Sequence, residues 1–105
     1  MKVTFVSPAG LTSLGGNETT VVRWQRLLEQ LGHTTGVGRS WQGADTDILI
    51  ALHARKSFES IREYHEQRPG APLVVALTGT DLYRDMDCGE EVHRALEMAT
   101  RVVVL

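Results

Sequence analysis

The sequence contains a single cysteine, Cys88, so no disulfide can form within the chain. Acidic residues surround it in the segment Asp87-Cys88-Gly89-Glu90-Glu91, and they disfavour the thiolate that a nucleophilic cysteine needs. We therefore interpret Cys88 as a passive residue, with a catalytic thiol as the alternative. Cysteine and histidine nowhere cluster at metal-ligand spacing, so the sequence predicts no metal site.

Long apolar runs and an excess of positive charge are also missing. The amino-terminal apolar run is too short for a signal peptide, and no other run approaches the length needed to span a membrane. The formal net charge of −2 gives no basic footprint for nucleic acid. These absences predict a cytoplasmic, soluble protein that contacts neither membrane nor nucleic acid. The length of 105 residues fits one domain.

Short apolar runs alternate with helical patterns along the chain. Strands are predicted at residues 3–6, 34–39, 47–52, 73–77 and 102–105, and helices from about residue 19 to 31, from 55 to 67 and from 90 to 98. Several strands are apolar throughout, as expected when helices cover both faces of a parallel sheet. The order predicts an α/β fold with a doubly wound, mostly parallel, Rossmann-like sheet.

The predicted helices carry apolar stripes that would face this sheet. The first has Val21, Trp24, Leu28 and Leu31 on one face with Leu27 beside them, and the second has Phe58, Ile61 and His65. Gly32 suits the left-handed cap that ends many helices. We interpret Trp24, Trp41 and Tyr83 as packing residues.

The last apolar run, Val102–Leu105, has the composition of an interior strand. Nothing follows it that could cover it, and a complete domain seldom ends inside such a strand. We therefore expect the chain to be part of a longer protein.

Polar residues follow three of the predicted strands, at residues 7–17, 53–57 and 78–85. Ligands of open parallel sheets bind beyond the carboxyl ends of the strands, so these loops are the candidate site. In the first loop, Gly15, Gly16 and Asn17 precede a helix whose backbone N–H groups could hold a phosphate. The loop is neither a P-loop nor a G-x-G-x-x-G motif, and a flexible turn is the alternative.

The second loop combines His53 with two cations, Arg55 and Lys56. Arginine suits bidentate contacts with phosphate oxygens, and lysine acts as a point charge. Charged and polar residues that directly follow a buried strand indicate that their side chains face a ligand. The alternative is a helix that begins in solvent, with a structural His53.

The third loop, Thr78-Gly79-Thr80-Asp81, places hydroxyls, a flexible glycine and a carboxylate at another strand end. The Asp81 carboxylate could accept hydrogen bonds from substrate hydroxyls. A capping role in the following turn is the alternative.

Several of these segments resemble the amino-terminal half of GT-B glycosyltransferases of family 4. The glycine pair before a helix that ends in Leu31-Gly32-His33 fits that family. The segments Ala51–Ser57 and Ala76–Asp85 are similar to those of selenosugar synthases of selenoneine biosynthesis, and the resemblance runs over nearly the whole chain. Thr78 stands where some relatives carry histidine, so His53 is the better candidate for a catalytic residue.

This resemblance implies a glycosyltransferase that transfers a sugar from a UDP-sugar to selenophosphate and forms a 1-seleno-sugar. It implies that residues 1–105 form the acceptor-side domain, that a carboxyl-terminal donor-binding domain is the partner, and that no metal or other cofactor is needed. Arg55 and Lys56 would then hold selenophosphate, and Gly15, Gly16 and Asn17 would approach the donor diphosphate. The fragment alone would be inactive.

Two other functions stay open. One is a glycosyltransferase with another acceptor, such as a thiol or a sugar. The other is a non-catalytic, flavodoxin-like or receiver-like module that binds an anion without turnover. Receiver domains need clustered acids near the first strand, and Ser7-Pro8 is a poor match for that requirement.

Overall fold

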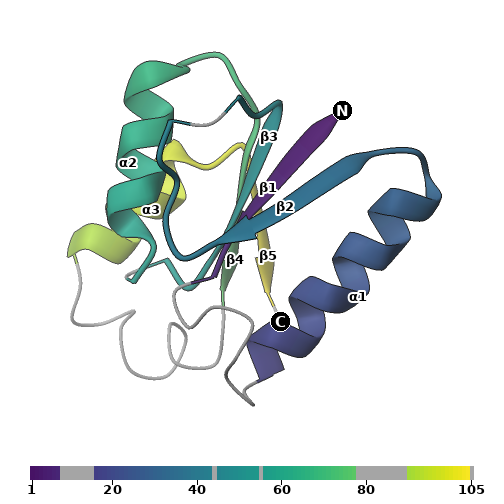
Figure 1. Ribbon diagram of the computed structural model, residues 1–105. Helices are drawn as coiled ribbons and strands as arrows, with labels where there is room; N and C mark the ends of the chain where they lie inside the picture. Colours follow the sequence, from purple (N-terminus) through teal and green to yellow (C-terminus); the bar gives the residue numbers. More distant parts are fainter. Residues whose placement is uncertain (8–15, 44, 55, 78–89, 105) are drawn as a thin grey trace.

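The computed structural model describes residues 1–7, 16–43, 45–54, 56–77 and 90–104 (Figure 1). Its strands form one parallel sheet in the order β2-β1-β3-β4-β5. The strands are β1 (Lys2–Val6), β2 (Thr34–Gly38), β3 (Ile48–Leu52), β4 (Leu73–Leu77) and β5 (Arg101–Val104), and the helices are α1 (Gly16–Gln30), α2 (Phe58–Gln67) and α3 (Glu90–Met98). The predicted doubly wound α/β sheet is therefore confirmed. Among the described residues, no helix is both long and apolar enough to cross a bilayer.

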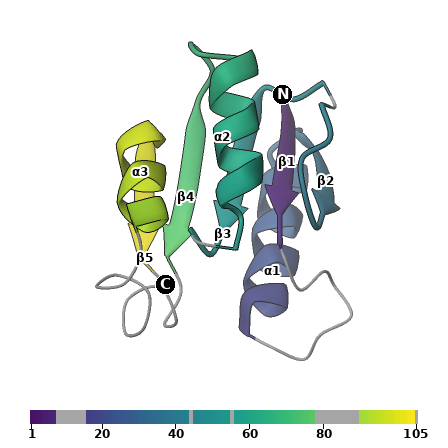
Figure 2. The same cartoon turned by 90° about the vertical axis from the view of Figure 1, so that its left-hand side faces the viewer.

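The helices lie on opposite faces of the sheet. Figure 1 shows α1 on one face, whereas α2 and α3 lie together on the other, in front of the sheet in Figure 2. Right-handed crossovers explain this arrangement. The chain moves from β1 to β2 in one direction and from β3 through β4 to β5 in the other, so its crossover helices change face.

Strand residues alternate between two apolar clusters, one on each side of the sheet. Leu49, Ala51, Leu73 and Val75 are buried in the cluster beneath α2 and α3. Val3, Phe5, Leu52 and Ala76 are buried in the cluster beneath α1. Because both faces are buried, the central strands read as continuous apolar runs.

The structure corrects two helix boundaries. Helix α1 begins at Gly16, ahead of the predicted residue 19, and α2 begins at Phe58, three residues after the predicted start at Arg55. The end of α1 agrees with the prediction. Gly32 has φ of +93°, and the His33 N–H bonds to the Leu28 carbonyl at 3.0 Å, as in a Schellman cap.

Two predicted stripe residues are not buried. Leu31 is 74% exposed, because it lies beyond the last turn of α1, and His65 is exposed. Tyr64 takes the place of His65 in the core. Its ring packs edge-on against Trp41 with the centroids 5.2 Å apart, and its hydroxyl donates to the Asp47 carbonyl at 3.3 Å.

Of the aromatic residues predicted to pack, Trp41 is buried and Trp24 is half-buried against Phe5. Tyr83 lies outside the described residues. A hollow of about 250 Å³ remains beside α1, lined by Trp24, Leu27, Leu28 and Ile50. This apolar hollow and the 53% exposure of Leu27 show that α1 leaves part of its face of the sheet uncovered.

Candidate functional site

The strand order reverses between β1 and β3. The chain leaves β1 toward β2 on one side, whereas β3 pairs with the other side of β1. The segments that follow β1 and β3 therefore diverge, and open α/β sheets bind their ligands at such a switch point. We take the carboxyl edge of β2, β1 and β3 as the candidate site.

Ser7 is the first residue after β1, and it is fully buried. Within the part of the chain that the structure describes, its hydroxyl has no hydrogen-bond partner. Ser7 continues the alternation of Val3 and Phe5, which places its side chain on the α1 side of the sheet. A buried hydroxyl without a partner costs about 1–3 kcal/mol, so such a group calls for an explanation.

His53 follows β3 with φ of +69°, the one positive value among the described non-glycine residues. Its backbone N–H donates to the Ala76 carbonyl at 3.0 Å, and its own carbonyl accepts from the Ser57 N–H at 2.9 Å. The left-handed conformation costs a non-glycine residue about 1–2 kcal/mol. Strain of this kind concentrates at functional sites, where the surrounding structure enforces it.

The tautomer of His53 follows from a further contact. The Lys56 N–H donates to its Nδ1 at 3.2 Å, so Nδ1 carries no proton and Nε2 carries the proton of the neutral ring. The Ser57 hydroxyl fixes the same turn by donating to the Leu52 carbonyl at 2.5 Å. The buried imidazole therefore accepts a hydrogen bond within its own turn.

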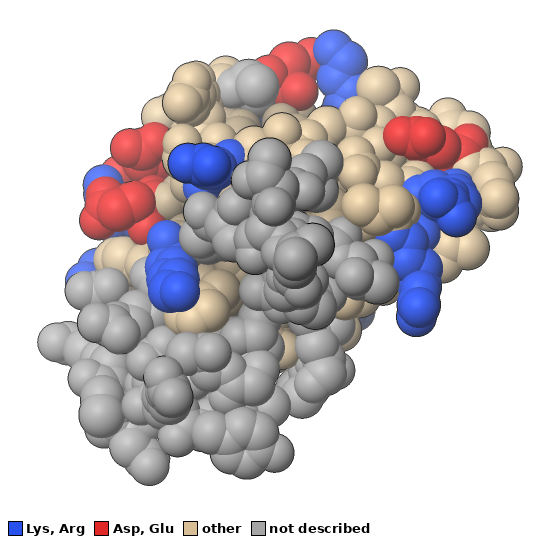
Figure 3. All heavy atoms as spheres, turned by 60° about the horizontal axis from the view of Figure 1, so that its bottom comes forward, with Lys and Arg blue, Asp and Glu red and all other residues tan. Residues whose placement is uncertain are grey.

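Cations gather at this edge of the sheet. Arg39 follows β2, Lys56 follows β3, and the Arg94 guanidinium lies 5.4 Å from the centre of the Phe58 ring at the start of α2. Figure 3 shows Lys and Arg side chains bordering the residues that are not described.

The opposite edge of the sheet holds acids that are paired with cations. Asp45 pairs with Lys2 and Arg68, both at 3.5 Å, and Asp47 accepts the Lys2 backbone N–H at 2.7 Å.

The carboxyl edge also carries an acid, Glu59 in the first turn of α2, which pairs with Arg62 at 2.8 Å. Arg39 and Lys56 are therefore the described cations that an anion at this edge could meet.

The structure places some of the predicted site residues at the carboxyl edge of the sheet, whereas others are not among the described residues. His53 and Lys56 lie there, and Gly16 and Asn17 form the first turn of α1 instead of a loop. The remaining predicted site residues lie outside the described residues: Gly15, Arg55, Thr78, Gly79, Thr80 and Asp81.

Neither Ser7 nor Arg39 stands out in the sequence. Serine is common after strands, and Arg39 follows a glycine-diluted run with no motif around it. The β1–β2 register joins them, because the Ser7 N–H donates to the carbonyl oxygen of Gly38 at 2.9 Å. That pairing is visible only in the folded sheet.

No group of three or more His, Cys, Asp or Glu side chains that could hold a metal ion exists among the described residues. Ser7 and His53 follow β1 and β3, so neither of these strand ends begins its loop with a carboxylate. Magnesium prefers carboxylate oxygens, so these two positions suit an anion better than a metal ion.

The chain is similar in structure to a response regulator receiver domain protein from Clostridium thermocellum. The match has a TM-score of 0.64 and covers 98% of this chain and 80% of that chain, at 15% sequence identity. The two share a flavodoxin-like fold. The strand order 2-1-3-4-5 is the order of that fold. No protein-family model matches the sequence, and no curated protein matches it.

These findings overturn the resemblance to GT-B glycosyltransferases and to selenosugar synthases. The solved structure described above is a receiver domain, and no sequence match supports a glycosyltransferase of selenoneine biosynthesis. The reason is physical: glycine, hydroxyl and charged residues follow the strands of any doubly wound sheet, because its binding loops lie there. Such short segments indicate the fold and not the family.

Several expectations from that resemblance stay predictions. They are the enzymatic activity, the lack of a cofactor, the UDP-sugar and selenophosphate ligands, and the carboxyl-terminal partner domain. The described residues contain nothing that tests them.

Proposed function

We propose that this chain is a non-catalytic, flavodoxin-like module that binds a small phosphate-like anion at the switch point between β1 and β3. The observation that carries the proposal is the Ser7 hydroxyl, which is buried at the end of β1 and has no partner among the described residues. A bound anion would accept its hydrogen bond and remove the cost of the unsatisfied group.

The neighbouring strand end supports an anion in particular. In the β1–β3 register Val6 pairs with Ala51, so Ser7 lies level with Leu52 and one residue before His53. Adjacent strands lie roughly 4.8 Å apart. A small anion at this strand end could therefore accept from the hydroxyl of Ser7 while it lies beside the turn that follows β3.

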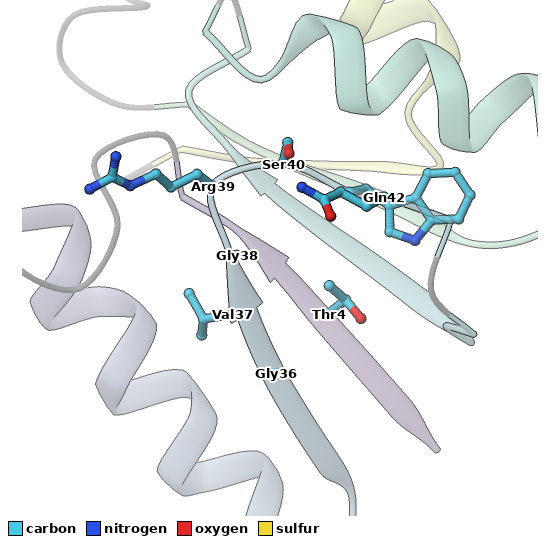
Figure 4. Close-up of a pocket in the computed structure, with 8 residues that line it drawn as sticks. Thr4, Gly36, Val37, Gly38, Arg39, Ser40 and Gln42 are labelled. Carbon is cyan, nitrogen blue, oxygen red and sulfur yellow. The ribbon is translucent and has the colours of Figure 1, made fainter.

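Positive charge supplies the attraction. Arg39 continues the alternation of Val37, and Figure 4 shows its guanidinium on the Val37 side of β2, the side on which Ser7 lies. Lys56 is exposed at the end of the β3 turn. Helix α1 begins at this edge, and the free N–H groups of a first turn also favour an anion.

The test is a titration of the ¹⁵N-labelled chain with inorganic phosphate, followed by amide chemical shifts. We expect shifts at Ser7, Arg39, His53 and Lys56. Arg39→Gln and Lys56→Gln should each weaken binding several-fold. The matched control Lys2→Gln, at the opposite, amino edge of the sheet, should leave binding unchanged.

Pyrophosphate tests the absence of turnover. It should bind at the same residues and be recovered intact, as followed by phosphorus NMR. Shifts spread over both edges of the sheet, or equal effects of Lys2→Gln and Arg39→Gln, would contradict a specific site. Hydrolysis of pyrophosphate would contradict the non-catalytic module.

A further inference from the structure

A second hollow lies against β2 on the face opposite α1. Its volume is about 410 Å³, and it is lined by Thr4, Gly36, Val37, Gly38, Arg39, Ser40, Trp41 and Gln42. Figure 4 shows the bare backbone of Gly36 and Gly38 beside Thr4, with the side chains of Ser40 and Gln42 above them. We call this hollow the glycine groove. Its volume falls within the range of roughly 300–1,000 Å³ that is usual for small-molecule sites.

The groove exists because of two features of the chain. The connection from β2 to β3, residues 39–47, contains no helix in its described part, so this end of the face lacks the cover that a crossover helix gives. Gly36 and Gly38 pair in register with Thr4 and Val6, and because they are glycines they direct no side chain into the space. A Cβ atom added at Gly36 would meet nothing within 4 Å.

We propose that the glycine groove binds the flat heteroaromatic ring of a nucleotide whose phosphate occupies the switch-point site. This inference rests on the proposed function, and it identifies the class of ligand as a nucleoside phosphate. The glycine backbone offers a flat floor against which a ring can lie at van der Waals distance, since no side chain holds the ring away.

Polar groups along the groove suit the edge of a nucleobase. The Gln42 amide is exposed and has no hydrogen-bond partner among the described residues, and it can both donate and accept. The Ser40 hydroxyl is exposed beside it. Trp41 is buried and forms one wall of the groove. Its backbone N–H donates a hydrogen bond to the Ser60 hydroxyl at 2.9 Å. A fixed wall with an amide at its rim favours a ring with donors and acceptors on its edge over an aliphatic ligand.

The groove leads to the proposed phosphate site. The Gly38 carbonyl at its end accepts the Ser7 N–H, and the next residue is Arg39. Three residues of strand, from Gly36 to Arg39, span roughly 10 Å. The extended form of a nucleoside monophosphate covers a similar length between base and phosphate. Because the groove and the Ser7 hydroxyl lie on opposite faces of the sheet, the ligand would have to pass over the carboxyl ends of β1 and β2.

The experiment compares AMP, GMP, CMP and UMP with ribose 5-phosphate and inorganic phosphate, each titrated into the 105-residue chain by calorimetry and amide chemical shifts. We expect at least one nucleotide to bind tenfold or more tightly than ribose 5-phosphate. That nucleotide should shift the amides of Gly36, Gly38 and Gln42, whereas phosphate should not.

The variant that isolates the groove is Gly36→Val. Open space surrounds a side chain at this position, and valine suits a strand, so the variant should fold. We expect the nucleotide to lose its tenfold advantage while phosphate binds as before. Gly70→Ala, another glycine whose Cβ meets nothing within 4 Å, is the control and should change neither affinity.

The outcomes separate the two proposals. If phosphate binds but no nucleotide exceeds ribose 5-phosphate, the groove inference is wrong and the anion site stands. An unchanged nucleotide affinity in Gly36→Val would also overturn the groove. If neither phosphate nor any nucleotide binds, the proposed function fails, and the inference fails with it.

Discussion

The backbone N–H of Ser7 donates a hydrogen bond to the carbonyl oxygen of Gly38 at 2.9 Å, which continues the β1–β2 ladder beyond both strands. This bond fixes the two strand ends side by side. It places the Ser7 hydroxyl beside Arg39 on the α1 side and brings the glycine groove to the same edge from the other side.

Ser7→Ala should separate stability from function. Removal of the unsatisfied hydroxyl should raise the free energy of unfolding by about 1 kcal/mol, measured by urea denaturation, while phosphate binding weakens. Ser60→Ala is the matched control. The Ser60 hydroxyl accepts a hydrogen bond from the Trp41 N–H, so removal of this hydroxyl should lower the free energy of unfolding by about 1–3 kcal/mol. A loss of stability in Ser7→Ala would contradict the account of a hydroxyl without a partner.

Glycine at position 53 should be more stable than alanine. Both variants remove the imidazole, but only glycine adopts φ of +69° without a steric cost. We expect His53→Gly to exceed His53→Ala by about 1 kcal/mol in free energy of unfolding. The same pair of substitutions at Glu63, inside α2, should reverse the order by a similar amount. Equal stabilities at position 53 would show that the turn relaxes.

Stability at high pH should depend on Tyr64. Burial, the largest cause, raises the pKa of its hydroxyl above the ordinary value of 10.0. Since the folded-state pKa lies above the unfolded one, the contribution of Tyr64 is fully present below pH 10 and is lost as the pH rises through the folded-state pKa.

Denaturation curves at pH 8 and pH 11 should therefore show a smaller loss of stability in Tyr64→Phe than in the parent chain. A spectrophotometric titration should lose its late phenolate step in the same variant. An equal loss in both chains would rule out the raised pKa.

Trp41 should be the costliest residue to truncate in the connection between β2 and β3. It is 2% exposed and packs edge-on against Tyr64, so Trp41→Ala should lower the free energy of unfolding by about 3–5 kcal/mol. Trp41→Phe keeps part of the contact and should lose less, which guards against a variant that does not fold. Leu31→Ala, at a 74% exposed position, should stay within about 0.5 kcal/mol. A small effect at Trp41 would show that the wall of the glycine groove is not fixed by packing.

The sequence alone determined the elements of this protein and their layering. The apolar run Leu73–Leu77 can be predicted as a strand, because a strand that is buried on both faces is apolar throughout. This prediction needs no knowledge of the strands that pair with it. Gly32 likewise ended α1 as predicted, because a left-handed cap favours glycine wherever it occurs. Boundaries were harder, since the turn that delays α2 depends on the contact between Lys56 and the ring of His53.

Only the tertiary structure decided which residues form the candidate site. The sequence led to His53 and Lys56, because they interrupt an apolar run, but it also suggested a family that the structural comparison overturned. The contributions of Ser7 and Arg39 arise from the register of β1 on β2, and that pairing joins positions 31 and 32 residues apart in the chain. The residues around Ser7 and Arg39 do not by themselves reveal this pairing, because the register is set when both strands bury their apolar side chains in a common core.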